Sequence, residues 1–326
     1  MKQAPSDKDK HRFKRAMEAL DKEKPRDALR LFEKVRKSWG DNPDIGYLEG
    51  LAYGKLGDTK GVIRVSERVL KLAPEHFGAL GNLANAQMLM GHSEDALENY
   101  AKALETNPNA PEVLGNYGRA LAILGRHEEA IEYCKKALKC NPTHAPALAA
   151  LGKSYAETGH TKAALQEFTK ALQLNPKLYE AHIGLGVLNC GSGGLDDAEL
   201  HFNEALHIEK GSIAAYVGLA NVKRYTVDYD KALKFLSDAE KYTSKDDPPL
   251  LSLKAHLLEQ KGDKEQAYNI INQLMEADNM FPQAIAVFSK LCRKYDRCDE
   301  ALEMIDRSIE QPATNTPEKQ ALMFAA

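Results

Sequence analysis

The chain has 326 residues, of which 43% are hydrophobic and 28% charged, and its 44 Lys/Arg against 47 Asp/Glu give a formal net charge of −3. This composition is that of a folded, soluble chain, and it excludes a collagen-like or intrinsically disordered protein. No stretch reaches the ~18 apolar residues of a membrane span, and the charged N-terminus is not followed by the apolar run of a secretory signal. We therefore expect no membrane insertion.

Cysteine usage indicates the compartment. The chain has no CxxC pair, and an odd number of cysteines is typical of thiols kept reduced in a cytoplasm. We therefore expect a cytoplasmic protein. The five cysteines are Cys134, Cys140, Cys190, Cys292 and Cys298.

The N-terminal part of the chain is basic, because residues 1–37 hold 13 Lys/Arg against 7 Asp/Glu. Such asymmetry can mark a surface that touches nucleic acid or an acidic partner. Here acidic residues interleave with the basic ones, which favours a solvated first helix pair, and we expect no nucleic-acid partner. Residues 1–8 are predicted to be a disordered basic lead. The interleaved acids are Asp7, Asp9, Glu18, Asp21, Glu23 and Asp27.

A sequence motif recurs every 34 residues and divides the rest of the chain into repeats. It reads LETNPNAP at 104–111, LKCNPTHAP at 138–146 and LQLNPKLY at 172–179. Apolar residues in each half of the period recur at i, i+3, i+4 and i+7, which predicts two amphipathic helices per unit. Glycine between the halves (Gly91, Gly125, Gly159) is predicted to end the first helix in the left-handed conformation, and the closing proline to end the second. In residues 145–178 the pattern is carried by Leu148, Leu151, Gly152, Tyr155, Ala164, Phe168, Ala171 and Pro176.

In chain order, repeats are predicted to begin near residues 9, 43, 77, 111, 145, 179, 213, 248 and 282. Residues 9–315 would form the array, and residues 316–326 would start a further repeat or a capping helix. The first repeat is recognised by Ala16, Ala28 and Phe32, and the second by Tyr53 and Gly57. The pattern is weakest in the last two repeats.

This spacing resembles that of the tetratricopeptide repeat family. The resemblance implies an all-α fold, a right-handed α-solenoid of about nine helix-turn-helix repeats. It also implies a non-enzymatic scaffold that binds a peptide or protein partner in its concave groove. The tail TPEKQALMFAA resembles the repeat region of bacterial proteins with a sulfotransferase-like C-terminal half. The alternative is therefore the substrate-recruiting N-terminal region of a larger enzyme, sulfotransferase-like or glycosyltransferase-like.

Motifs for catalysis or cofactors were sought and not found. The glycine run at 191–194 lacks the GxxxxGK[ST] of a phosphate-binding loop, and Ile131 stands where HExxH needs its second histidine after His127. No nucleophile, base and orienting group can be assembled. We expect no catalytic residue, no cofactor and no metal.

Candidate binding residues lie in the first helix of each repeat, at the sixth and ninth residues of the repeat. The apolar side chains with which this helix packs lie at other positions, so these two positions are free to face a partner. Side-chain amides both donate and accept, so asparagine there can pair with the backbone of an extended peptide. The predicted groove residues are Asn82, Asn85, Asn116, Arg119, Lys153 and Asn221, with Tyr47 at the N-terminal end.

Two known binding modes of the family can be compared with these residues. Asn82 and Asn116 resemble the asparagine ladder of O-linked N-acetylglucosamine transferase, which Ala150 then interrupts. Asn85 and Asn116 match the clamp with which co-chaperones hold the tail of a heat-shock protein. Gly81, Pro146 and Ala150 stand where that clamp needs basic residues. A heat-shock chaperone tail is therefore not expected as the partner.

Overall fold

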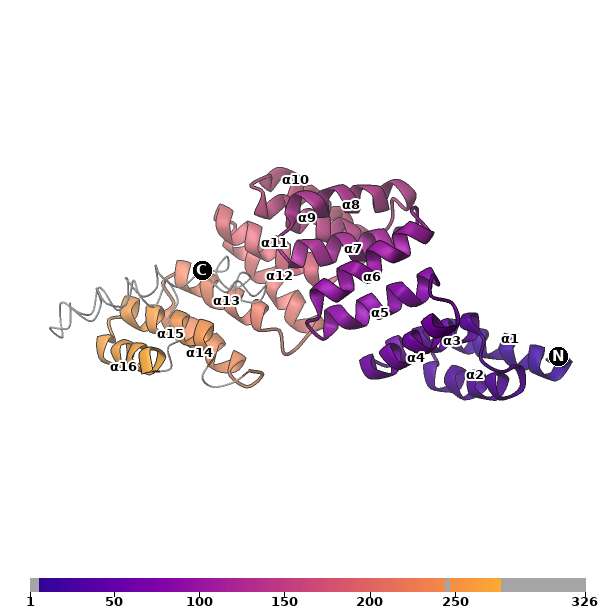
Figure 1. Cartoon of the computed structure of the whole chain (residues 1–326). Helices are drawn as coiled ribbons and strands as arrows, with labels where there is room; N and C mark the ends of the chain where they lie inside the picture. The colour runs from indigo at the N-terminus through magenta and orange to yellow at the C-terminus, as the bar shows by residue number, and fades with distance from the viewer. Residues whose placement is uncertain (1–5, 244–246, 277–326) are drawn as a thin grey trace. The chain divides into compact units, whose positions relative to one another are not determined.

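The computed structural model describes residues 6–243 and 247–276, which form sixteen α-helices and no strand (Figure 1). The expected all-α fold of helix-turn-helix repeats is thus confirmed. The predicted ninth repeat, the tail from 316, Cys292 and Cys298 lie outside the described residues. The helices are α1 (Asp7–Asp21), α2 (Pro25–Trp39), α3 (Pro43–Lys55), α4 (Thr59–Leu72), α5 (Phe77–Leu89), α6 (Ser93–Thr106), α7 (Pro111–Ile123), α8 (His127–Cys140), α9 (Ala145–Glu157), α10 (Thr161–Leu174), α11 (Tyr179–Ser192), α12 (Leu195–Ile208), α13 (Ile213–Tyr225), α14 (Tyr229–Ala239), α15 (Pro248–Lys261) and α16 (Lys264–Glu276).

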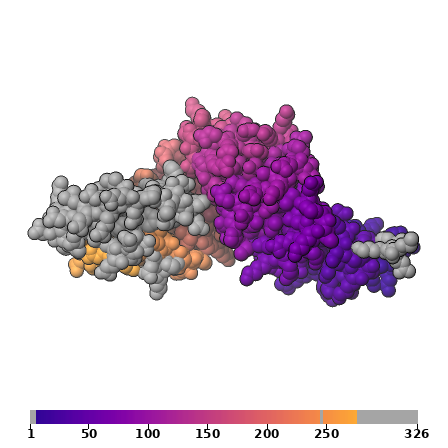
Figure 2. All heavy atoms as spheres, in the orientation of Figure 1, coloured from indigo at the N-terminus to yellow at the C-terminus, as the bar shows by residue number. Residues whose placement is uncertain are grey.

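The chain divides into two compact units, Met1–Thr158 and Gly159–Ala326. The first unit contains α1–α9 and the second contains α10–α16. Within each unit a helix packs against its neighbours in the chain, and the first helices of successive pairs also touch, as α7 and α9 do. Stacking buries the apolar face that a single pair would leave in water. In the space-filling view the side chains close the gaps between the ribbons of α5–α8 (Figure 2).

Local sequence signals set the ends of these helices. Gly91, Gly125 and Gly159 have φ of +78°, +75° and +80°, which confirms the conformation predicted for the turn glycines. Glycine takes such values without the steric penalty that a Cβ brings. At the start of α3, the side-chain oxygen of Asn42 accepts a hydrogen bond from the backbone N–H of Asp44 at 2.8 Å, which satisfies a free donor of the first turn.

One side chain from the second helix of a pair fills the space between two first helices. In the second unit the ring of Phe202 on α12 contacts both Gly186 on α11 and Gly218 on α13, at the points where a Cβ would lie. Phe168 on α10 covers Gly184 on α11 in the same way. The place of these rings, the twenty-fourth of the repeat, is taken in the first unit by Phe32, Ser66, Tyr100 and Cys134, which differ widely in size.

Two helices approach each other closely at Gly118 on α7. A Cβ there would lie 2.5 Å from the Cys134 sulfur and 3.1 Å from the Cys134 backbone nitrogen. Ala130 and Ala137 on α8 are fully buried. Because interiors are packed at the density of organic crystals, there is no free volume at this crossing for even a methyl group.

Candidate functional site

The candidate surface lies in the first unit, on the first helices α3, α5, α7 and α9, and we call it the groove face. These helices adjoin one another in that order, α3 against α5, α5 against α7 and α7 against α9. Six of the seven predicted groove residues therefore lie on the first helices of successive pairs within one unit. These six are Tyr47, Asn82, Asn85, Asn116, Arg119 and Lys153.

A hollow of about 270 Å³ opens between α3 and α5 on the groove face. Its polar lining includes Asn82 and Asn85, and its apolar lining includes Leu51 and Leu89. Leu89 is 77% exposed, which is unusual for a large apolar side chain next to a cavity. Ser66 lies next to this hollow, beside Gly50, at a place where α2, α6, α10 and α12 carry an aromatic ring. The remaining lining of the hollow is Gly50, Gly54, Gly57, Thr59, Val62 and Ala86.

The two asparagines of the hollow differ in their hydrogen bonding. The amide nitrogen of Asn82 is buried and has no hydrogen-bond partner. The amide oxygen of Asn85 accepts a 2.5 Å hydrogen bond from the hydroxyl of Tyr100. A buried donor without an acceptor is costly, by about 1–3 kcal/mol, so Asn82 gains stability from any ligand that brings an acceptor to it.

Farther along the groove face, Asn116 and Arg119 on α7 and Lys153 on α9 are half-buried. None of the three side chains has a hydrogen bond or ion pair within the part of the chain that the structure describes. Burial lowers the pKa of the Lys153 ammonium, because a desolvated cation is disfavoured, and the charge of Glu157 partly opposes this shift. The N–H groups of these three side chains are therefore free to donate hydrogen bonds to a ligand.

Tyr47 and Asn221 are less available than their sequence positions suggested. The Tyr47 ring packs on Gly78 at the start of α5 and lies 5.5 Å from the ring of His76. Burial raises the pKa of its hydroxyl, and the charge of Glu112 adds to the shift. Asn221 lies on α13 in the second unit and is only 1% exposed, and its amide oxygen accepts a hydrogen bond from Arg224 at 3.1 Å.

Sequence reasoning missed the hollow itself. The sixth places of two repeats are glycines, Gly184 and Gly218, and these are small because Phe168 and Phe202 occupy the adjacent space. The signal that could have found the hollow is the serine at position 66, sixteen residues before Asn82.

Within residues 6–243 and 247–276, no group of three or more His, Cys, Asp or Glu side chains could hold a metal ion. Burial raises the pKa of the Cys134 thiol to about 12, so this thiol is a core side chain and a poor nucleophile at neutral pH. Within the same residues, no helix has the length and apolar character needed to cross a bilayer.

Stacked helix-turn-helix pairs with left-handed turn glycines and small residues at the crossings define the class of helical repeat proteins. Three family models, each described as tetratricopeptide repeat, match residues 13–61 and 82–145, residues 133–166 and residues 248–279. Together they cover about half of the chain, and the chain belongs to the tetratricopeptide repeat family.

Solved structures share this fold. A chain of the APC/C hetero-tetramer Cut9–Hcn1 is 17% identical with a TM-score of 0.70, over 82% of this chain and 52% of that one. A tetratricopeptide repeat protein from Parabacteroides merdae is 22% identical, with a TM-score of 0.55, over 76% and 98%. Pseudomonas aeruginosa pilF is 18% identical, with a TM-score of 0.54, over 66% and 97%. This chain thus spans about half the length of the Cut9–Hcn1 chain, and a comparison with curated proteins gives no match.

Proposed function

We propose that the chain is a non-enzymatic interaction scaffold whose first unit binds an extended peptide segment of a partner protein on the groove face. The tetratricopeptide repeat fold is one of protein–protein interaction scaffolds, which supports the general class. The observation that carries the proposal is the buried amide nitrogen of Asn82, which has no acceptor and borders the hollow.

The chemistry of the groove face matches that of an extended peptide. Asn82, Asn116, Arg119 and Lys153 all offer N–H donors without partners, and a peptide backbone offers a carbonyl acceptor at every residue. An extended chain rises about 3.3 Å per residue, so a few residues bring acceptors to several of these donors. The apolar rim of the hollow, Leu51 and Leu89, would receive one side chain of the peptide.

The test starts from a peptide selected on the full chain from a random-sequence display library, with its affinity measured by fluorescence anisotropy. Replacing Asn82, Asn116, Arg119 and Lys153 together by Ala should weaken binding by about tenfold or more, because each removes a donor.

The control replaces Lys71, Lys102, Asn109 and Lys139 by Ala, all exposed and outside the first helices, and it removes three positive charges against two in the groove variant. It should change the affinity by less than about twofold. If the groove variant keeps its helical circular dichroism and full affinity, the groove face is not the binding site.

Two expectations from the sequence stay predictions. The cytoplasmic location rests on the cysteine pattern alone. The alternative, a recruiting region of a larger enzyme, rests on the tail, and it requires an open reading frame in the gene past Ala326.

A further inference from the structure

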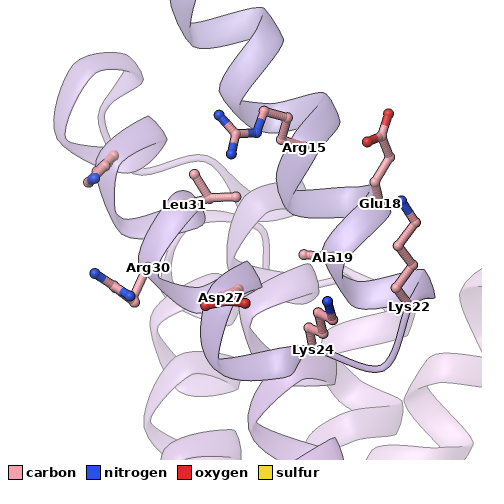
Figure 3. A pocket seen from close by; sticks show the side chains of 9 residues that line it. Arg15, Glu18, Ala19, Lys22, Lys24, Asp27, Arg30 and Leu31 are labelled. Atoms are coloured by element: carbon pink, nitrogen blue, oxygen red, sulfur yellow. The ribbon is translucent and has the colours of Figure 1, made fainter.

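A second surface lies in the first unit, between α1 and α2, and we call it the basic trough (Figure 3). Its volume is about 370 Å³. Ala19 and Leu31 lie between the two helices, and charged side chains surround them (Figure 3). Five of the lining side chains are basic and two are acidic: Arg15, Lys22, Lys24, Arg30 and Lys34 against Glu18 and Asp27.

The five basic side chains of the trough are exposed, and none has an ion pair within the described residues. Other basic side chains on the same two helices do form ion pairs. Lys10 pairs with Asp7 at 3.2 Å, and Lys37 pairs with Glu33 at 2.9 Å. The positive charge of the trough is therefore not neutralised by the protein itself. A ligand that binds there does not first have to break a salt bridge.

The two acidic residues do not change this conclusion. Glu18 lies four residues before Lys22, a spacing that often gives an ion pair, but the two side chains form none. Asp27 lies in the first turn of α2, where the partial positive charge of the helix N-terminus stabilises a carboxylate. The trough thus keeps an excess of positive charge.

The position of the trough in the fold explains why it is polar but not why it is basic. Arg15 and Glu18 stand two 34-residue periods before Leu83 and Ala86 on α5. Those two are 9% and 2% exposed, because that face of α5 is covered by the preceding pair. The same face of α1 is exposed, and an exposed face of an array needs polar residues. Mixed charges would meet that need.

Like charges one turn apart are unfavourable for the helix that carries them. Arg30 and Lys34 lie four residues apart on α2, and like charges at that spacing repel one another and destabilise a helix. Folding and solubility therefore do not account for the set. An anionic partner does, because it would remove this repulsion on binding.

We infer that the basic trough docks an acidic segment of a partner protein, an extended stretch rich in Asp and Glu. From Arg15 to Lys22, α1 rises by roughly 10 Å at 1.5 Å per residue. An extended chain covers that length with about three to four residues. Guanidinium groups bind carboxylates through two parallel hydrogen bonds, as Arg15 and Arg30 can, while Lys22 and Lys34 add point charges. This surface is separate from the groove face and does not depend on it.

The test uses the full chain and a fluorescein-labelled oligoglutamate peptide, with an oligoglutamine peptide of equal length as the neutral probe and single-stranded oligouridylate as the nucleic-acid probe. The trough variant replaces Arg15, Lys22, Arg30 and Lys34 by Gln. The control variant replaces Lys8, Lys14, Arg26 and Lys37 by Gln, which removes the same charge from the same two helices outside the trough.

We expect the trough variant to bind oligoglutamate about tenfold more weakly and the control variant to stay within about twofold, with both helical by circular dichroism. Binding of oligoglutamate should weaken when the ionic strength is raised to ~0.15 M, and oligoglutamine should not bind. Equal losses in the two variants would show attraction to net charge and overturn the proposal. The proposal would also be overturned if the unmodified chain did not bind oligoglutamate. It would equally be overturned if oligouridylate bound more tightly than oligoglutamate through the same four basic side chains.

Discussion

Exchanging one pair of side chains tests how the hollow of the groove face arises. Ser66→Phe combined with Asn82→Gly copies into α4 and α5 the arrangement of Phe168 and Gly184 on α10 and α11. The glycine needed on the other side of the ring is already present, because Gly50 on α3 faces Asn82 and Ser66. The double variant should fill the hollow with an aromatic ring and leave the helices in place.

The magnitudes follow from the contacts. A Cβ on Gly50 would lie 3.0 Å from the Asn82 amide nitrogen and 4.0 Å from the Ser66 hydroxyl, so both side chains border the same space. Ser66→Phe alone overfills that space and should destabilise by about 1–3 kcal/mol. Asn82→Gly alone removes the unpaired amide, but it enlarges the cavity and puts a glycine inside α5, and the net effect should be a destabilisation of about 1 kcal/mol. The double variant buries a ring worth ~1.5–3 kcal/mol and removes an unpaired amide, and it should be stabilised by about 1–3 kcal/mol.

The assay is a double-mutant cycle measured by urea denaturation. Because repeat arrays can open locally, hydrogen exchange of the α3–α5 amides gives a second reading of the same free energies. We expect a coupling of at least ~2 kcal/mol between the two positions. The double variant should also lose the peptide selected on the groove face. Additive single effects, within about 0.5 kcal/mol, would refute the shared space on which this reasoning depends.

Three further predictions concern the first unit. Gly118→Ala should lower the free energy of unfolding by about 1–3 kcal/mol, because the new methyl group meets backbone atoms. Gly81→Ala should raise the free energy of unfolding by ~0.5–1 kcal/mol, because the new methyl group meets only a valine methyl at 3.5 Å. Equal urea midpoints for the two variants would contradict this. Glu49→Ala should destabilise by about 1–3 kcal/mol in the same assay, because this carboxylate is 5% exposed between Arg36 and Arg68, which would keep only their longer ion pairs with Asp41. An unchanged midpoint would show the pairing to be unimportant. Burial raises the pKa of the Cys134 thiol to about 12, so this thiol stays protonated at pH 8 and should resist alkylation until the chain unfolds. The exposed thiol of Cys140 should react in the folded chain. Equal labelling of the two cysteines in the folded chain, measured by mass spectrometry, would refute the burial of Cys134.

The sequence by itself determined the helix pairs, because the signals that specify them are local. Alternation of apolar residues at helical spacing predicts each helix from its own residues. A glycine such as Gly125 marks a turn because its own backbone must take a positive φ, here +75°. A glycine is also required at Gly118, since only a residue without a side chain tolerates the approach of Cys134.

Only the tertiary structure decided which groove positions are open. Asn82 and Asn221 are both asparagines at free places of a first helix, yet one borders a hollow and the other is 1% exposed. The difference depends on side chains from other helices, such as Ser66, which leaves the space beside Asn82 unfilled. Side chains from successive pairs share the volume between two first helices. Because the interior is close-packed, the space open to one side chain depends on the sizes of the others.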